Sequence, residues 1–164
     1  MSEMEAETQQ AVTVRAATPA EDGIVASHFY QLWLDNQVAP SDLLPDSRDR
    51  IVQFIAHARI ELSYQAFVAE VNNRIVGSAG GQEFAGLYPA PFVARYRKYG
   101  YVWGVYVEAA YRRRGIAKQL TTAVLDHLKQ LNCTRAILHA SPAGQSVYTH
   151  LGFVNSNEMR LDLG

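Results

Sequence analysis

Hydrophobic and polar positions follow two different spacings along the chain, and each spacing predicts a different kind of element. Two-residue alternation and short apolar runs predict strands, whereas apolar residues three and four positions apart predict helices. The predicted strands span residues 12–15, 66–71, 74–81, 101–107, 136–140 and 158–163, and the predicted helices span residues 23–36, a segment around 51–58, residues 116–132 and a short helix that ends at 151–152. This order predicts a mixed sheet with helices.

Local turn chemistry supports several of these boundaries. Residues 18–22 (Thr-Pro-Ala-Glu-Asp) carry the residue types that begin helices. The dipeptide Asn72-Asn73 suits positive φ between two strand-like runs, so residues 66–81 are predicted to form a hairpin. Gly152 suits the C-terminal end of a helix.

Residues 85–100 interrupt the regular pattern and look like an insertion between two strands. They contain two prolines, four aromatic residues and three basic residues: Pro89, Pro91, Tyr88, Phe92, Tyr96, Tyr99, Arg95, Arg97 and Lys98. Such a segment lines a ligand pocket, covers a cleft as a lid, or contacts another subunit. If it lines a pocket, its basic side chains favour a ligand that also carries an acidic group.

Composition narrows the class of protein. A chain of 164 residues, 48% of them hydrophobic, predicts one domain over residues 11–164, preceded by a disordered polar tail over residues 1–10. The net charge of −1 argues against a general nucleic-acid or anionic-membrane binder. One cysteine, the lack of a signal peptide and the lack of a long apolar run predict a cytoplasmic protein that does not enter a membrane.

Residues 112–117 (Arg-Arg-Arg-Gly-Ile-Ala) lie where the strand at 101–107 gives way to a helix. Backbone N–H groups and the positive end of a helix dipole attract anions at such a junction. A basic run by itself also fits a solvated face, but Gly115 and Ala117 keep the approach to the backbone free of bulky side chains. The position therefore predicts a phosphate site.

The spacing Arg112-x-x-Gly-x-Ala117 resembles the loop with which the GNAT superfamily of N-acetyltransferases binds the pyrophosphate of coenzyme A. Residues 148–153 (Tyr-Thr-His-Leu-Gly-Phe) resemble the Tyr-x-x-x-Gly-Phe ending of that family. Residues 107–112 resemble the family's strand end, turn and Tyr-Arg, although a proline is more usual at 109 or 110. The resemblance covers nearly all of the chain after residue 11.

This resemblance implies an α/β (α+β) fold with a mixed, mainly antiparallel central sheet and helices on both faces. The strands at 101–107 and 136–140 are expected to splay apart and form the cofactor cleft. The residues implied in acetyl-CoA binding are Val105, Tyr106 and Val107 on the first of these strands, Arg112, Arg113, Arg114, Gly115, Ile116, Ala117 and Lys118 in the phosphate loop, and Ser141 and Tyr148 further on.

The resemblance also implies catalytic roles. Tyr148 matches the tyrosine that protonates the departing thiolate, and a phenol with a pKa near ~10 suits that transfer; the alternative is that its ring only packs. Glu108 and Glu83 are the candidate general bases, each with an alternative as a solvated carboxylate. His139 is a further candidate, and a water chain can serve an amine whose pKa is lowered by burial.

The function implied is acetyl transfer from acetyl-CoA to a primary amine of a small molecule by direct attack. Protein or peptide acetylation and non-catalytic acyl-CoA sensing remain alternatives, and no residue identifies the acceptor. The five histidines lack paired ligand spacing, so no metal is expected. No nucleic-acid or membrane partner is expected. A homodimer is compatible with this fold, but no sequence feature fixes it.

Overall fold

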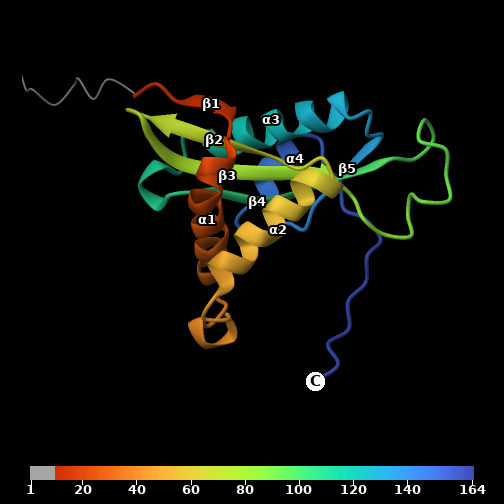
Figure 1. The fold of residues 1–164 in the computed structure, drawn as a ribbon, viewed down its shortest axis with the longest axis horizontal. Helices are drawn as coiled ribbons and strands as arrows, with labels where there is room; N and C mark the ends of the chain where they lie inside the picture. Colours follow the sequence, from red (N-terminus) through yellow and green to blue (C-terminus); the bar gives the residue numbers. More distant parts are fainter. Residues whose placement is uncertain (1–9) are drawn as a thin grey trace, which may run out of the picture.

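The protein is described by a computed structural model over residues 10–164. The tail predicted at residues 1–10 therefore lies outside the described residues except for its last position. Along the chain the elements are β1 (Thr13–Ala16), α1 (Asp22–Asp35), α2 (Ser47–Glu61), β2 (Gln65–Val71), β3 (Arg74–Glu83), β4 (Tyr99–Val107), α3 (Ile116–Gln130), β5 (Arg135–Ile137) and α4 (Gln145–His150) (Figure 1).

The strands form one sheet in the order β1-β2-β3-β4-β5. The first three pairings are antiparallel, and β4 and β5 are parallel because α3 carries the chain back between them. The expected mixed, mainly antiparallel sheet is confirmed.

Two apolar clusters hold helices against opposite faces of this sheet. One cluster joins the sheet to α3 through Ile116, Leu120 and Val124. The other joins the sheet to α1 and α2 through Val25 and Ile55. In Figure 1, α1 and α2 lie in front of the sheet and α3 lies along its far side. The expected placement of helices on both faces is therefore confirmed. No helix within residues 10–164 is long and apolar enough to cross a membrane.

The predicted hairpin is also confirmed. Asn72 and Asn73 join β2 to β3 with φ values of 51° and 62°. Two central residues at positive φ give the tight turn whose twist matches that of the flanking strands. The predicted helix start is present as well, because the Glu21 carboxylate accepts a hydrogen bond from the Thr18 amide in a capping box.

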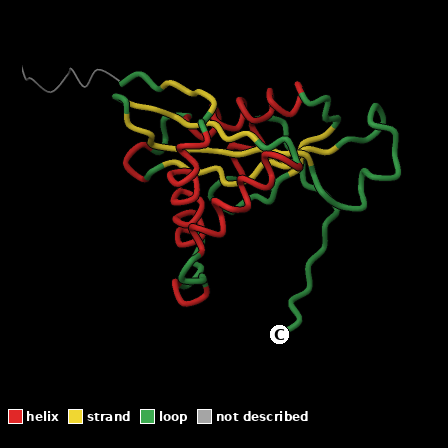
Figure 2. The backbone as a smooth tube through the Cα atoms, viewed as in Figure 1, coloured by secondary structure: helices red, strands yellow, loops and turns green. Residues whose placement is uncertain are grey.

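The predicted bounds of two strands and one whole predicted strand were wrong. β4 begins at Tyr99, inside the segment expected to be irregular, so the insertion is shorter than 85–100. β5 ends at Ile137 rather than at residue 140. The expected last strand at 158–163 is absent from the described sheet, and the C-terminal segment leaves the body of the protein as a loop (Figure 2). Its alternating apolar residues are exposed, because no neighbouring strand buries them.

Gly77 on β3 lies where the strand passes under α3. A Cβ atom added there would be 2.8 Å from the Tyr106 carbonyl oxygen and 3.3 Å from the Leu120 side chain. We therefore expect Gly77→Ala to lower the free energy of unfolding by roughly 1–3 kcal/mol, as overpacking does. Urea denaturation measures this change.

Gly23→Ala is the matched control, because an added Cβ at Gly23 meets no atom within 4 Å and the residue lies in α1. It should leave the free energy of unfolding unchanged or raise it by up to ~1 kcal/mol. Equal destabilisation by both substitutions would contradict the close packing of β3 beneath α3.

Candidate functional site

The first feature of the site is a gap in the sheet. β4 and β5 pair only from Tyr99–Arg135 to Tyr101–Ile137. Beyond Tyr101, β4 continues to Val107 whereas β5 has ended, so this edge of β4 has no strand partner among residues 10–164. Backbone N–H and C=O groups require hydrogen-bond partners. The open edge is therefore a surface on which an extended ligand can pair as an added strand does.

A β-bulge in β4 explains where the gap opens. Two residue steps on β3, from Ser78 to Gly80, face three steps on β4, from Tyr106 to Trp103. Gly104 lies in the extra stretch with φ at 68°, a left-handed conformation that glycine adopts without a Cβ clash. Because a bulge bends its strand and increases the local twist, β4 turns out of line with β5 at this point.

The second feature is the connection from β4 to the N-terminus of α3. Gly115 caps the helix with φ at 74°, and no side chain accepts a hydrogen bond from the first amides of α3. Arg113 also has a positive φ, of 64°. Ile116 is buried against the sheet and anchors the helix start, while the arginines before it are exposed. Uncapped amides beside exposed cations attract anions, so this connection is the candidate site for a phosphate group.

The cations of this loop have different surroundings. Arg112 donates from Nε to the Val107 carbonyl at 2.8 Å and from Nη2 to Asp35 at 2.6 Å, and its guanidinium lies 5.6 Å from the centroid of the Tyr106 ring. Its charge is therefore used to tie α1 to the end of β4. Arg113 makes no ion pair within the described part of the chain, which leaves its charge available to an anion.

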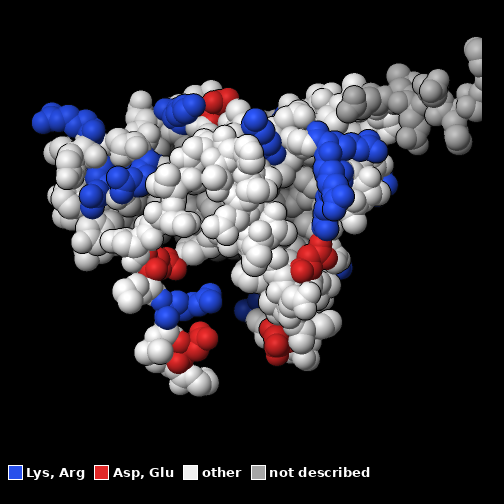
Figure 3. All heavy atoms as spheres, turned by 180° about the vertical axis from the view of Figure 1, so that it is seen from behind, with Lys and Arg blue, Asp and Glu red and all other residues white. Residues whose placement is uncertain are grey.

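Figure 3 shows that basic side chains gather in a continuous band at the side of the molecule that contains the connection from β4 to α3. That side lies at the left of Figure 1 and at the right of Figure 3, since the two views differ by a half turn. Arg112, Arg113, Arg114 and Lys118 are all exposed in this connection and the first turn of α3. The surface is therefore locally positive although the net charge of the whole chain is −1.

The third feature is α4, which contacts α3. Tyr148 packs edge-on against Phe153, with ring centroids 5.8 Å apart, and burial raises the pKa of its phenol. The Ser141 hydroxyl accepts a hydrogen bond from the Gly144 amide at 3.3 Å in the turn before the helix. Tyr148 Oη has no hydrogen-bond partner among residues 10–164, so it can donate to a ligand.

The two predicted carboxylates are not brought together. Glu83 ends β3, where it lies opposite Gly100 of β4. Its carboxylate forms an ion pair with Lys98 Nζ at 3.0 Å. Glu108 follows the opposite end of β4 and pairs with Arg74 Nη2 at 2.7 Å. Each carboxylate is thus engaged by a cation and lies away from the middle of β4.

His28 is a site neighbour that the sequence analysis did not identify. Its Nδ1 lies 2.8 Å from Ser78 Oγ, its Nε2 lies 3.8 Å from Glu108 Oε1, and its ring lies 5.1 Å from the Tyr106 ring. Burial lowers the pKa of the imidazole, although Glu108 opposes this effect. The available signal was the helical spacing from Val25 to His28, which puts the histidine on the buried face of α1.

Another polar group lies where β4 and β5 part. Tyr101 Oη is 2.9 Å from His139 Nδ1, and His139 Nε2 is 2.9 Å from a carboxylate oxygen of Glu158. His139 and Glu158 are exposed, whereas Tyr101 is partly buried. Among residues 10–164, no group of three or more His, Cys, Asp or Glu side chains is arranged to hold a metal ion.

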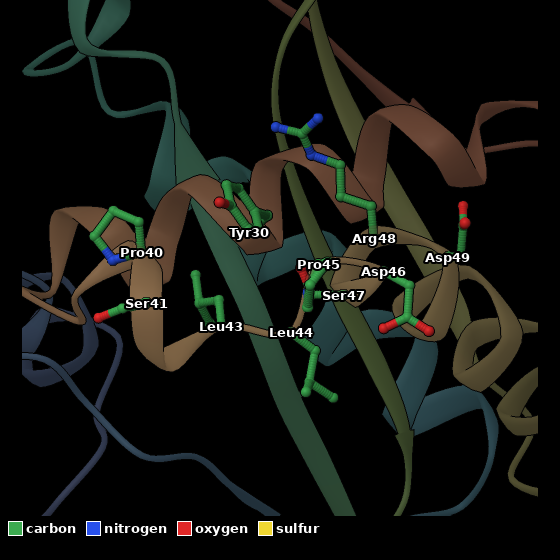
Figure 4. A pocket seen from close by; sticks show the side chains of 10 residues that line it. All are labelled: Tyr30, Pro40, Ser41, Leu43, Leu44, Pro45, Asp46, Ser47, Arg48 and Asp49. Atoms are coloured by element: carbon green, nitrogen blue, oxygen red, sulfur yellow. The ribbon is translucent and has the colours of Figure 1, made fainter.

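A cavity of about 590 Å³ lies between α1 and the segment that leads into α2. Figure 4 shows Tyr30 on α1 and the side chains of the other lining residues, which are Pro40, Ser41 and residues 43–49. The Arg48 guanidinium stands 4.6 Å from the centroid of the Tyr30 ring. Next along α1, Phe29 packs on Trp103 of β4 with ring centroids 5.0 Å apart, whereas every residue that lines the cavity belongs to α1 or to residues 40–49.

Most basic side chains in the segment between β3 and β4 have partners within the protein. The Arg97 guanidinium lies 4.8 to 5.6 Å from the ring centroids of four aromatic residues, namely Tyr88, Phe92, Tyr96 and Tyr99. Lys98 pairs with Glu83 and also donates to the Leu131 carbonyl. These contacts stabilise the segment and leave Arg95 as its one basic side chain without such a partner in the described chain.

Comparison with known proteins agrees with this architecture. A profile of the Acetyltransferase (GNAT) family matches residues 26–153. Glucosamine 6-phosphate N-acetyltransferase 1 of Oryza sativa subsp. japonica is 28% identical over 128 residues, which cover 77% of this chain and 74% of that protein.

Solved structures share the fold at low sequence identity. A predicted acetyltransferase with acetyl-CoA from Clostridium acetobutylicum has a TM-score of 0.77 and 22% identity, covering 93% of this chain and 97% of the other. An aminoglycoside N-acetyltransferase in complex with CoA has a TM-score of 0.71 and 19% identity, covering 94% of this chain and 95% of the other. With the profile match over most of its length, the chain belongs to the acetyltransferase (GNAT) family and is an N-acetyltransferase.

Proposed function

We propose that the protein transfers an acetyl group from acetyl-CoA to a primary amine of a small molecule by direct attack. The observation that carries this proposal is the open edge of β4, which leads directly to the uncapped N-terminus of α3. An extended arm can pair with the strand while a pyrophosphate at its end accepts hydrogen bonds from the helix amides. One molecule of acetyl-CoA has both chemical parts.

The residues of the loop before α3 have different roles in binding the pyrophosphate. The amides of Arg113 to Lys118 donate hydrogen bonds to the pyrophosphate, and Arg113 and Lys118 add charge-assisted hydrogen bonds. Arg112 acts indirectly, because its bonds to Asp35 and the Val107 carbonyl hold the loop against α1 and β4. Since that carbonyl is already bonded, the arm pairs mainly with Val105 and Tyr106.

The chemistry then needs a polarised carbonyl and a protonated leaving group. A backbone N–H of β4 near the bulge donates to the thioester oxygen and stabilises the charge that develops as nitrogen attacks. Tyr148 donates its proton to the departing thiolate. Its raised pKa keeps the phenol protonated at neutral pH, as a general acid requires.

The acceptor is a small amine, and an amine on a sugar is the first class to test. The rice relative is named for glucosamine 6-phosphate, and the CoA-bound structural neighbour is an aminoglycoside N-acetyltransferase. The cavity beside Tyr30 and Arg48, between α1 and the segment that leads into α2, offers both polar and apolar surface to such a molecule. Free-thiol release from acetyl-CoA, measured with amino sugars, aminoglycosides, polyamines, amino acids and peptides, tests this proposal.

Replacing Gly115 should weaken acetyl-CoA binding. Gly115 has φ at 74°, so a β-branched side chain strains the loop that presents the helix amides. We expect Gly115→Val to lower the affinity for acetyl-CoA by at least ~10-fold, equivalent to about 1.4 kcal/mol. Isothermal calorimetry measures the affinity directly.

Gly152→Val is the control for backbone strain, since Gly152 also has a positive φ and open space around it but lies outside the loop. It should bind acetyl-CoA like the unmodified protein. Unchanged binding by Gly115→Val would remove the loop from the proposed site.

Replacing Tyr148 should separate turnover from binding. Tyr148→Phe keeps the ring against Phe153 but removes the proton donor, so we expect kcat to fall by about 10²-fold or more with little change in acetyl-CoA affinity. In the unmodified protein, turnover should be lost at high pH, as the pH rises through the raised pKa of Tyr148.

Tyr96→Phe, at an exposed tyrosine in the segment between β3 and β4, is the matched control and should leave kcat unchanged. Steady-state kinetics and calorimetry on both variants provide the comparison. A parallel loss of turnover and affinity in Tyr148→Phe would assign the residue to binding instead.

A further inference from the structure

We propose that Tyr101, His139 and Glu158 form a proton relay that accepts the proton of the attacking amine. This inference rests on the proposed acetyl transfer and adds the general base that the reaction needs. The three residues come from β4, from the chain just after β5 and from the C-terminal segment. The fold brings together groups that are 38 and 19 positions apart in the sequence.

The hydrogen bonds among Tyr101, His139 and Glu158 set the direction in which a proton moves. Burial and the nearby Glu158 charge raise the pKa of Tyr101, so its hydroxyl keeps its proton and donates to His139 Nδ1 at 2.9 Å. His139 Nε2–H then donates to the Glu158 carboxylate at 2.9 Å. This assigned tautomer leaves Nδ1 as the acceptor, and the carboxylate stabilises the imidazolium that forms when a proton arrives.

The relay lies at the entrance to the gap. Tyr101 is the last residue of β4 that pairs with β5, opposite Ile137. The neighbouring positions Gly100 and Val102 face α3, because Leu128 lies 2.6 Å from a Cβ built at Gly100 and Val102 belongs to the α3 cluster. Since side chains alternate along a strand, Tyr101 faces the side on which α1 and α2 lie.

Tyr148 belongs to a different element, α4, which contacts α3. In the proposed complex, a thioester in the gap meets the phenol of Tyr148 on its sulfur side and the Tyr101 hydroxyl from the α1 face. Attack on a carbonyl requires this separation, because the amine and the thiolate occupy different sides of the reacting carbon.

The reaction moves one proton from the amine to His139 and one proton from Tyr148 to the thiolate. The amine nitrogen forms a bond to the carbonyl carbon, and the bond from that carbon to sulfur breaks. The nitrogen releases one proton to Tyr101 Oη as the tyrosine passes its own proton to His139 Nδ1. Tyr148 supplies one proton to the thiolate. His139 then loses its extra proton to water, which reaches it because the side chain is exposed, and Tyr148 regains a proton from water.

The other carboxylates are less suitable for this step. Glu83 is paired with Lys98, and Glu108 is paired with Arg74 and lies beyond the bulge. The titratable groups bonded to His139 are Tyr101 on β4 and Glu158 in the C-terminal segment; no other ionisable side chain among residues 10–164 forms a hydrogen bond or ion pair with it.

Substitution of His139 gives the first test. With the best amine from the acceptor panel, we expect His139→Ala to lower kcat/KM for the amine by about 10²-fold or more while acetyl-CoA affinity stays unchanged. Added imidazole should restore part of the turnover, because the site is open to solvent. His57→Ala, an exposed histidine on α2, is the control and should neither lose turnover nor respond to imidazole.

Substitution of Tyr101 and Glu158 gives the second test. Tyr101→Phe removes the hydroxyl that passes the proton to His139, so kcat/KM should fall without loss of acetyl-CoA binding. Glu158→Gln removes the carboxylate that accepts the hydrogen bond from His139 Nε2–H, so kcat/KM should fall by less than in His139→Ala. A folding defect would weaken acetyl-CoA binding as well.

The outcomes separate the relay from the reaction itself. If the unmodified protein acetylates an amine and the His139 and Tyr101 variants match it at every pH, the relay is overturned and the acetyl transfer stands. If acetyl-CoA binds but no amine in the panel is acetylated by the unmodified protein, the proposed function and the relay both fail. Loss of turnover in the His139 and Tyr101 variants at unchanged acetyl-CoA affinity, with imidazole rescue of His139→Ala, supports both.

Discussion

The arrangement of the site depends on how little β4 and β5 pair. Three residues of each strand meet before β4 reaches the bulge at Gly104 and turns away. The rest of β4 keeps one bonded edge, toward β3, and one open edge that leads to the N-terminus of α3. If the two strands paired along their full length, the sheet would satisfy its own backbone groups and leave no room for the arm of a cofactor.

The separation of β4 from β5 also places the two ends of the proposed ligand at different parts of the site. In the proposed reaction, the phosphate end of the ligand binds at the start of α3, where uncapped amides and exposed cations meet. The reacting end would lie near the bulge, with Tyr148 on the α4 side and Tyr101 at the point where β4 and β5 part. The proposed relay through His139 and Glu158 extends from there to solvent. In this proposal, strand separation connects binding, proton donation and proton acceptance, and no step uses a metal.

Several basic side chains of this protein contact neighbouring groups of the protein itself. Arg112 is part of the loop motif, yet its guanidinium holds α1 and the end of β4 together. Arg97 is surrounded by aromatic rings of its own segment, and Lys98 is paired with Glu83. The expectation that this segment selects an acidic ligand is weakened as a result. The sequence lists the charges, but their partners decide which of them a ligand can reach.

The sequence alone determined the order of the elements, the hairpin at Asn72-Asn73 and the loop before α3, because periodicity, turn residues and glycine spacing are local properties. It misjudged β5 and the segment 158–163, because pairing depends on whether another strand lies alongside, and an apolar pattern carries no such information. Its motifs predicted Tyr148 and the phosphate loop. The contact of Tyr101 with His139 and Glu158, and that of His28 with Ser78, arose only when distant segments packed together. Distances between groups remote in the chain are set by tertiary packing, so the tertiary structure decided which polar residues can exchange a proton.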